Sequence, residues 1–247
     1  MEPARQAVKD QFDGPWKEIL EVQLSQFVAF FVPGAWNEID WDRKPVPLNS
    51  ELRRSRRSSA TPDRRADNLF KVYLRSGGEQ YVVIHVELQS TVDPALAERM
   101  FEYGYRAWDR HRRKVASIAV LGDSAPDYRP SAFGWHLWGS RMRYEYPIVK
   151  LLEYRERWSE LEASRNIFAV VVMAYLKTQD TRDDPTARLH WKSRLVRLLY
   201  ERKYSREEVV TLFQLIDWMM HLPEEQAIIF EADLESLEAE QDMPYIT

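Results

Sequence analysis

The sequence predicts an α/β protein, with a central mixed β-sheet formed by residues 66–150, a helix before it and a helical C-terminal region. Two strand-like runs flank a Gly-Gly pair at residues 77–78, a pattern typical of a β-hairpin. A helical stretch and a continuous apolar run follow, in the order of a right-handed βαβ crossover with parallel strands. We therefore expect a core domain over residues 1–150 and a helical C-terminal extension, packed on that core, over residues 151–247.

The first expected element is a helix between Pro15 and Pro33. Its large apolar side chains recur every three to four positions, as on a buried helix face: Trp16, Ile19, Leu20, Leu24, Phe27, Phe30 and Phe31. The pair Pro33-Gly34 should end this helix. Residues 42–65 are rich in Arg, Pro and Ser, and we expect an exposed connection with a short ordered piece near Leu48–Leu52.

The hairpin strands are expected at Ala66–Leu74 and Gln80–Gln89. A helix should then run from Pro94 to about Arg113, with Asp93 as its N-cap. The expected buried side of this helix carries Leu96, Met100, Tyr103 and Ala107, with Trp108 as an open case.

The run Val115–Leu121 is apolar almost throughout, as in a strand covered on both faces. Tyr144–Val149 is expected to add another strand. The C-terminal helices are expected at residues 166–178, 186–201, 205–221 and 223–239.

The chain has 247 residues and no cysteine, which excludes disulfides, thiolate metal sites and a cysteine nucleophile. No apolar run reaches the roughly 18 residues that a transmembrane helix needs, and the first residues lack the apolar core of a signal peptide. Phosphate-binding loops, dinucleotide-binding turns, nucleophile elbows and HExxH zinc motifs are also absent from the sequence. We expect a soluble, cytoplasmic protein that does not interact with membranes.

The net charge of −4 conceals a strong asymmetry along the chain. Residues 43–114 carry 16 basic and 9 acidic side chains, whereas residues 201–247 carry 3 basic and 12 acidic ones. A basic centre between acidic ends indicates a polyanionic partner, although clustered surface charge is often only a solvated face.

The hairpin predicts a pair of facing carboxylates. If its turn is three residues long and centred on Gly77, Asp67 and Glu87 lie directly opposite each other on the same face of the ladder. Their Cβ atoms would then be roughly 4.5–5.5 Å apart. A two-residue turn would place them on opposite faces, so the inference depends on turn length.

Like charges opposite each other destabilise a sheet unless they are neutralised. One explanation is a divalent cation, since two carboxylates together with water or phosphate oxygens suit Mg²⁺ and the metal-assisted hydrolysis of phosphodiesters. The alternative is that Asp67 is an ordinary sheet-edge carboxylate, paired with Lys71 or Arg65.

The sequence of this region resembles a known family. The resemblance rests on four runs, ADNL at 66–69, IHVELQ at 84–89, AERMFEY at 97–103 and the stretch from Val115 to Asp123. In this order and spacing they resemble the PD-(D/E)XK nuclease family transposases, the recombination-promoting nuclease (Rpn)-like proteins. Shorter similarities upstream and downstream extend the resemblance over most of the chain.

The resemblance implies a restriction-endonuclease-like αβββαβ core, dependence on Mg²⁺ and cleavage of DNA. Asp67 matches the metal-binding aspartate, and Glu87 and Gln89 match the (D/E)-x-K element with glutamine in place of lysine. A neutral amide cannot take up a proton as a deprotonated lysine can, but it can orient the attacking water. Lys71 or His85 could replace the missing lysine.

Three further groups complete the expected site. Glu51 is the candidate for an additional upstream carboxylate, with Glu21 as the competing choice. Arg99 could assist at the phosphate, or it could pair with Glu98 or Glu102. The arginines before the first hairpin strand are expected to contact DNA phosphates: Arg53, Arg54, Arg56, Arg57, Arg64 and Arg65.

An aromatic cluster downstream of the core motifs has two interpretations. Phe133, Trp135 and Trp138 are expected in the core or in a lid, with stacking on nucleic-acid bases as the alternative.

The predicted function is therefore a Mg²⁺-dependent DNA endonuclease of the transposase and recombination-promoting type. The alternative is an inactive nuclease-like fold that binds DNA or a protein. A third interpretation is a structural module in which Asp67 and Glu87 are surface carboxylates. Restriction-like folds often act as dimers, so a homodimer is a further expectation from the resemblance.

Overall fold

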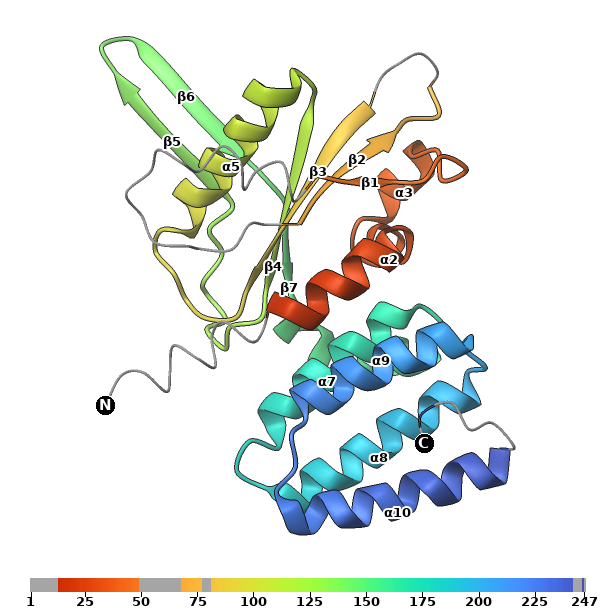
Figure 1. Ribbon diagram of the computed structural model, residues 1–247. Coiled ribbons are helices and arrows are strands. Elements are labelled where there is room, and N and C mark those ends of the chain that lie inside the picture. The colour runs from red at the N-terminus through yellow and green to blue at the C-terminus, as the bar shows by residue number, and fades with distance from the viewer. Residues whose placement is uncertain (1–12, 49–67, 77–80, 242–245, 247) are drawn as a thin grey trace. The chain divides into compact units, whose positions relative to one another are not determined.

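The computed structural model describes residues 13–48, 68–76, 81–241 and 246 (Figure 1). The chain divides into two compact units, one formed by Leu20–Leu152 and the other by Met1–Ile19 together with Glu153–Thr247. The first unit has 20 basic and 16 acidic side chains, a net charge of +4, and the second has 15 basic and 23 acidic ones, a net charge of −8. The basic centre of the sequence therefore belongs to the first unit, and the acidic C-terminal region belongs to the second.

The unit Leu20–Leu152 contains a five-stranded mixed sheet in the order β1-β2-β3-β4-β7. Its strands are β1 Val46–Pro47, β2 Asn68–Tyr73, β3 Tyr81–Gln89, β4 Val115–Leu121 and β7 Ile148–Lys150. The first three strands are antiparallel neighbours, while β4 is parallel to β3, and β7 is parallel to β4. The predicted α/β class and the predicted parallel crossover are confirmed.

The hairpin has the predicted register along its described pairs. Tyr73 lies opposite Tyr81, and Asn68 lies opposite Val86 at the other end of the ladder. These pairs are centred on position 77, as expected for the predicted turn. Asp67 itself lies outside the described residues, so its pairing with Glu87 stays a prediction.

Helix α5, Leu96–His111, connects β3 to β4 and covers one face of the sheet (Figure 1). Its residues Leu96 and Met100 pack against Ala119 and Leu121 of β4. The predicted buried face is confirmed, apart from the open case of Trp108, which is about half exposed.

The predicted N-cap of α5 is wrong by two positions. The cap is Ala95, and the Asp93 carboxylate instead accepts a hydrogen bond from the Ala95 backbone N–H in the turn before the helix. Short polar side chains stabilise such turns as readily as helix starts.

Helix α2, Asp13–Phe31, matches the predicted first helix but is interrupted at Gln23, whose backbone is not helical. Pro33-Gly34 does not simply end it. Pro33 is instead the first residue of a second short helix, α3 Pro33–Glu38, because its missing N–H is not needed in a first helical turn. Of the connection over residues 42–65, the described part contributes β1, and residues 49–65 lie outside the description.

A second, two-stranded sheet was not predicted. It is the hairpin of β5, Ala132–Leu137, and β6, Ser140–Glu145. The predicted strand Tyr144–Val149 is therefore wrong as a single element, since its first two residues belong to β6 and its last two to β7. Tyr146 and Pro147 separate them.

The unit containing the C-terminal region is helical. Its helices are α6 Trp158–Ala163, α7 Ile167–Asp180, α8 Pro185–Glu201, α9 Arg206–Met219 and α10 Glu224–Gln241. The four predicted C-terminal helices are confirmed, whereas α6 and the short 3₁₀ helix η2, Leu151–Arg155, were not predicted. Helix α7 is buried along ten consecutive residues, and its Phe168 ring lies 6.2 Å from that of Trp16 in the first part of α2. None of the described helices is long and apolar enough to cross a membrane.

Candidate functional site

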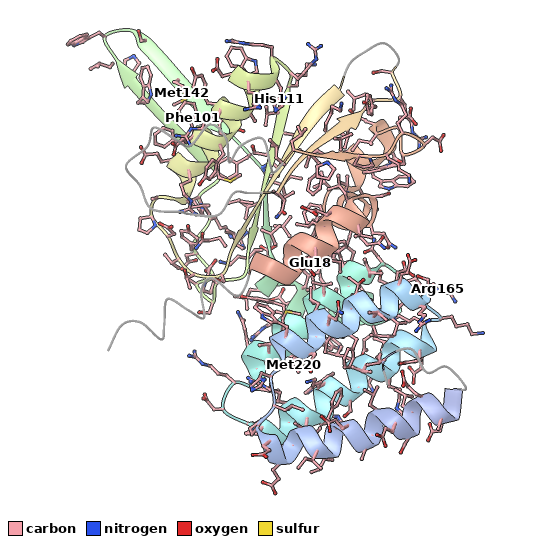
Figure 2. The ribbon with its side chains drawn as sticks, in the orientation of Figure 1. Glu18, Phe101, His111, Met142, Arg165 and Met220 are labelled. Carbon is pink, nitrogen blue, oxygen red and sulfur yellow. The ribbon has the colours of Figure 1, made fainter. Side chains whose placement is uncertain are left out.

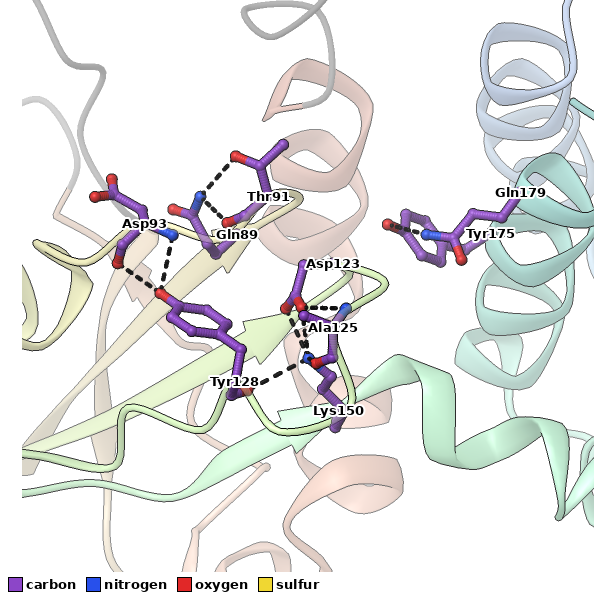
Figure 3. Close-up of polar contacts among 9 residues, drawn as sticks. All are labelled: Gln89, Thr91, Asp93, Asp123, Ala125, Tyr128, Lys150, Tyr175 and Gln179. Atoms are coloured by element: carbon purple, nitrogen blue, oxygen red, sulfur yellow. Dashed lines mark hydrogen bonds and ion pairs between the residues drawn. The ribbon is translucent and has the colours of Figure 1, made fainter.

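Polar side chains gather where the parallel strands of the sheet end (Figure 3). Gln89, Leu121 and Lys150 are in register as the last residues of β3, β4 and β7. Asp123 follows β4 by two residues. The carboxyl edge of parallel strands is the usual location of binding sites in open α/β sheets.

Gln89 is almost fully buried, with 7% of its surface exposed, and its carboxamide is held at both ends. Its Nε2 donates to the Thr91 carbonyl oxygen at 2.6 Å and to the Thr91 hydroxyl at 3.3 Å. Its Oε1 accepts from Arg99 Nη2 at 2.8 Å. The sequence predicted that the Gln89 amide orients the attacking water. In this structure both ends of the amide bind protein groups instead.

Arg99 reaches Gln89 from the first turns of α5. Its Nη1 also forms an ion pair with the Asp93 carboxylate, and the two side chains are only 13% and 20% exposed. Glu102, one of the two predicted alternative partners of Arg99, forms an ion pair with Arg106, and the predicted alternative pairing of Arg99 stays a prediction. A charge-assisted hydrogen-bond network therefore joins the end of β3 to α5.

Tyr128 extends the network to the loop after β4. Its hydroxyl donates to the Asp93 carbonyl oxygen at 2.6 Å and accepts from the Asp93 backbone N–H at 3.2 Å. Burial raises the pKa of the Tyr128 phenol above its ordinary value of 10.0, and the charges of Asp93 and Asp123 act in the same direction. The phenol therefore stays protonated at neutral pH and can keep donating to Asp93.

Lys150 and Asp123 form a buried ion pair beside this loop. Lys150 Nζ lies 2.7 Å and 2.8 Å from the two Asp123 carboxylate oxygens, and the side chains are 1% and 2% exposed. The ammonium group also donates to the carbonyl oxygens of Ala125 at 2.7 Å and Tyr128 at 3.3 Å. This pair fixes the loop that carries Tyr128.

Most residues of the predicted site lie outside the description. Asp67 and Glu51 are outside it, as are the six arginines between residues 53 and 65. Glu87 is placed by its backbone in β3, in register with Ala119. Glu21 is exposed on α2. Within the described part of the chain no three potential metal-ligating side chains come together.

Lys71 and His85 were the candidates to replace the lysine of the (D/E)-x-K element, and the structure describes the side chain of Lys71 only. Lys71 Nζ lies 5.4 Å from the centroid of the Tyr73 ring and, by hydrogen bonding, lowers the pKa of that phenol. Lys71 therefore lies beside Tyr73 and stands four positions after Asp67 in the sequence. His85 is placed only by its backbone in β3.

Sequence reasoning brought Gln89 and Arg99 into one site, and the structure places them in contact. It missed Asp123, Tyr128 and Lys150 as members of the same network. The only available signal was position, because Asp123 and Lys150 stand at or just after the ends of apolar strands.

One comparison with known proteins gives a match. A family model described as "Putative transposase, YhgA-like" matches residues 60–120, about a quarter of the chain. The matched segment includes β2, β3, α5 and nearly all of β4, and with them Gln89 and Arg99. No curated protein and no solved structure matches the chain.

Proposed function

We propose that the protein is a Mg²⁺-dependent DNA endonuclease of the PD-(D/E)XK transposase and recombination-promoting type. The observation that carries this proposal is the network of Gln89, Arg99 and Asp93 at the end of β3, inside the segment that resembles transposases. The order of helix, three antiparallel strands, helix and parallel strand agrees with the αβββαβ core that the resemblance implies.

Asp67 and Glu87 are the proposed metal ligands. The β2–β3 register supports this assignment, because the pair that follows Asn68 and Val86 would be Asp67 and Glu87. Carboxylate oxygens are the donor chemistry that Mg²⁺ prefers. When bound, the ion would activate water and neutralise charge on the phosphate. Glu51 remains the proposed additional carboxylate.

Gln89 acts here as a positioning residue for Arg99. Its Oε1 and the Asp93 carboxylate fix the guanidinium group on two sides, so the cation is set in place before any substrate arrives. A guanidinium presented in this way can stabilise negative charge on a phosphate that approaches the end of β3.

The arginines at positions 53, 54, 56, 57, 64 and 65 would neutralise phosphates of the DNA backbone without reading its sequence. The net charge of +4 on the unit that contains the sheet supports a polyanionic partner.

Incubation of the full chain with supercoiled plasmid in Mg²⁺ and in EDTA tests the proposal. We expect relaxed and linear products in Mg²⁺ and none in EDTA. DNA binding without Mg²⁺-dependent cleavage would instead favour the alternative, an inactive nuclease-like fold that binds DNA. The absence of both would leave a protein-binding role and a structural role as the remaining interpretations.

A further inference from the structure

The β5–β6 hairpin is firmly anchored at its base. The Phe133 ring stacks on Phe101 of α5 with 5.4 Å between centroids, and the Tyr144 hydroxyl lies 2.6 Å from Ser117 Oγ of β4. Gly104 of α5 permits this approach, because a Cβ atom there would lie 2.1 Å from the Tyr144 hydroxyl. The base of the hairpin is therefore fixed to both α5 and the main sheet.

The far end of the hairpin is exposed and apolar. Trp138 at the tip is 95% exposed, and Leu137 and Trp135 are 55% and 51% exposed. Of the two expected locations, core or lid, the core is wrong for Trp135 and Trp138. The tip of the hairpin extends away from α5 in the upper part of Figure 1. In Figure 2, the label Met142 marks the hairpin and the label Phe101 marks α5.

The tip places a tryptophan where the backbone disfavours one. Trp138 and Gly139 have φ angles of +49° and +83°, and they form the two-residue connection between the paired residues Leu137 and Ser140. Such turns favour Asn or Gly at both positions, and a bulky residue in the left-handed region is strained. Because Trp138 buries almost no surface in return, folding does not explain its presence at the tip.

The two faces of the ribbon differ in chemistry. Trp135 pairs with Met142 on one face, while His136 pairs with Arg141 on the other. Arg143 lies on the same face as Arg141 and forms an exposed ion pair with Glu145. Arg141 makes no hydrogen bond or ion pair to any of the described residues.

This combination fits DNA better than a second protein chain. The exposed aromatic and aliphatic side chains of a narrow ribbon tip fall short of the roughly 800 Å² per partner that a stable protein interface buries. A two-stranded ribbon can enter a groove of DNA. Aromatic side chains stack on accessible base faces, and arginines neutralise the adjacent phosphates.

We infer that the β5–β6 hairpin is a DNA-binding ribbon, in which Trp138 stacks on an unpaired base while Arg141 binds a neighbouring phosphate. The inference rests on the proposed function only in taking DNA as the partner. It makes no use of the metal site and adds a preference for DNA with unpaired bases.

The test is the affinity of the full chain for a fluorescently labelled single strand of about 20 nucleotides, measured by anisotropy in EDTA so that no Mg²⁺-dependent cleavage occurs. Stacking by one aromatic residue typically contributes a factor of about ten or more in affinity. We expect Trp138→Ala to weaken binding about tenfold and Trp138→Phe to retain most of it. Arg141→Ala should weaken binding and also reduce its salt dependence.

Matched controls lie in the other unit. Ile228→Ala removes another exposed apolar side chain, and Arg182→Ala removes an exposed arginine. Both should bind DNA like the wild type. Trp138→Asn separates folding from binding, because it should keep or raise the melting temperature while weakening DNA binding.

Wild-type affinity in Trp138→Ala and Arg141→Ala would overturn the inference, even if the protein cleaves plasmid. A change in sedimentation coefficient of Trp138→Ala with unchanged DNA affinity would assign the tip to contact between two copies of the chain and also overturn it. Conversely, Trp138-dependent binding without any cleavage would support the hairpin assignment and count against the proposed endonuclease.

Discussion

Arg99 Nη2 donates a hydrogen bond to Gln89 Oε1 at 2.8 Å, and this contact joins the last residue of β3 to α5. The ion pair between Arg99 and Asp93 closes the intervening loop. Because Gln89 lies two residues after Glu87, the same contacts hold in place the strand end that carries a proposed metal ligand.

Replacement of Asp93 by Asn should destabilise the fold, because it keeps the shape of the side chain but removes a negative charge that pairs with the largely buried Arg99. We expect a loss of about 2 kcal/mol in the free energy of unfolding, measured by urea denaturation. Asp109→Asn is the control, since Asp109 pairs with Arg112 on the surface, and its loss should be below about 0.5 kcal/mol. Equal effects of the two substitutions would contradict the importance of the Arg99 network.

Lys150→Met should be more damaging, because it leaves the Asp123 carboxylate buried and without its cation. Removal of one partner from a buried pair typically costs about 3–5 kcal/mol. Addition of Asp123→Leu should restore part of the lost stability, since an apolar pair avoids burying a charge. If the double variant is less stable than Lys150→Met, Asp123 contributes through contacts other than the ion pair, such as its acceptance from the Ala125 N–H.

Gly104→Ala should destabilise the base of the β5–β6 hairpin by about 1–3 kcal/mol, since the added methyl group would overlap the Tyr144 hydroxyl. Gly34→Ala is the matched control. It lies in helix α3 with nothing within 4 Å of the new methyl group, so stability should stay constant or rise. Melting temperatures measured side by side distinguish the two. A harmless Gly104→Ala would show that Tyr144 can move away without cost.

The free energy of unfolding should fall at high pH, because the buried phenol of Tyr144 then loses its proton. Burial raises the pKa of its phenol above 10.0, while the hydrogen bond to Ser117 acts weakly in the opposite direction. The folded state therefore holds this proton more tightly than the unfolded state. The resulting contribution is fully present below pH 10 and is lost as pH rises through the raised folded pKa. Urea midpoints between pH 8 and pH 11 should fall less steeply for Tyr144→Phe than for the wild type, and parallel curves would contradict the assignment.

The sequence was sufficient where structure follows from local pattern. The Gly-Gly pair in the sequence predicted the β2–β3 register that the described pairs have, and the apolar run Val115–Leu121 predicted the bounds of β4. The β5–β6 hairpin was missed because its strands contain Gly134 and carry exposed rings, so they lack the usual alternation of apolar and polar residues.

The contacts of the candidate site could be predicted only in part. Gln89 and Arg99 belong to runs that carry the family resemblance, but the partners of Gln89 depend on the direction of its side chain, which no pattern specifies. Lys150 and Asp123 are 27 positions apart and meet only because β4 and β7 are parallel neighbours. Such pairings follow from the topology of the sheet.

Isosteric replacement of the proposed metal ligands tests the endonuclease most directly. Asp67→Asn and Glu87→Gln should each reduce Mg²⁺-dependent cleavage of supercoiled plasmid at least a hundredfold, the scale expected when a group that acts on the transition state is lost. Both variants should bind DNA in EDTA with wild-type affinity. Cleavage at the wild-type rate by both would contradict the proposed active site.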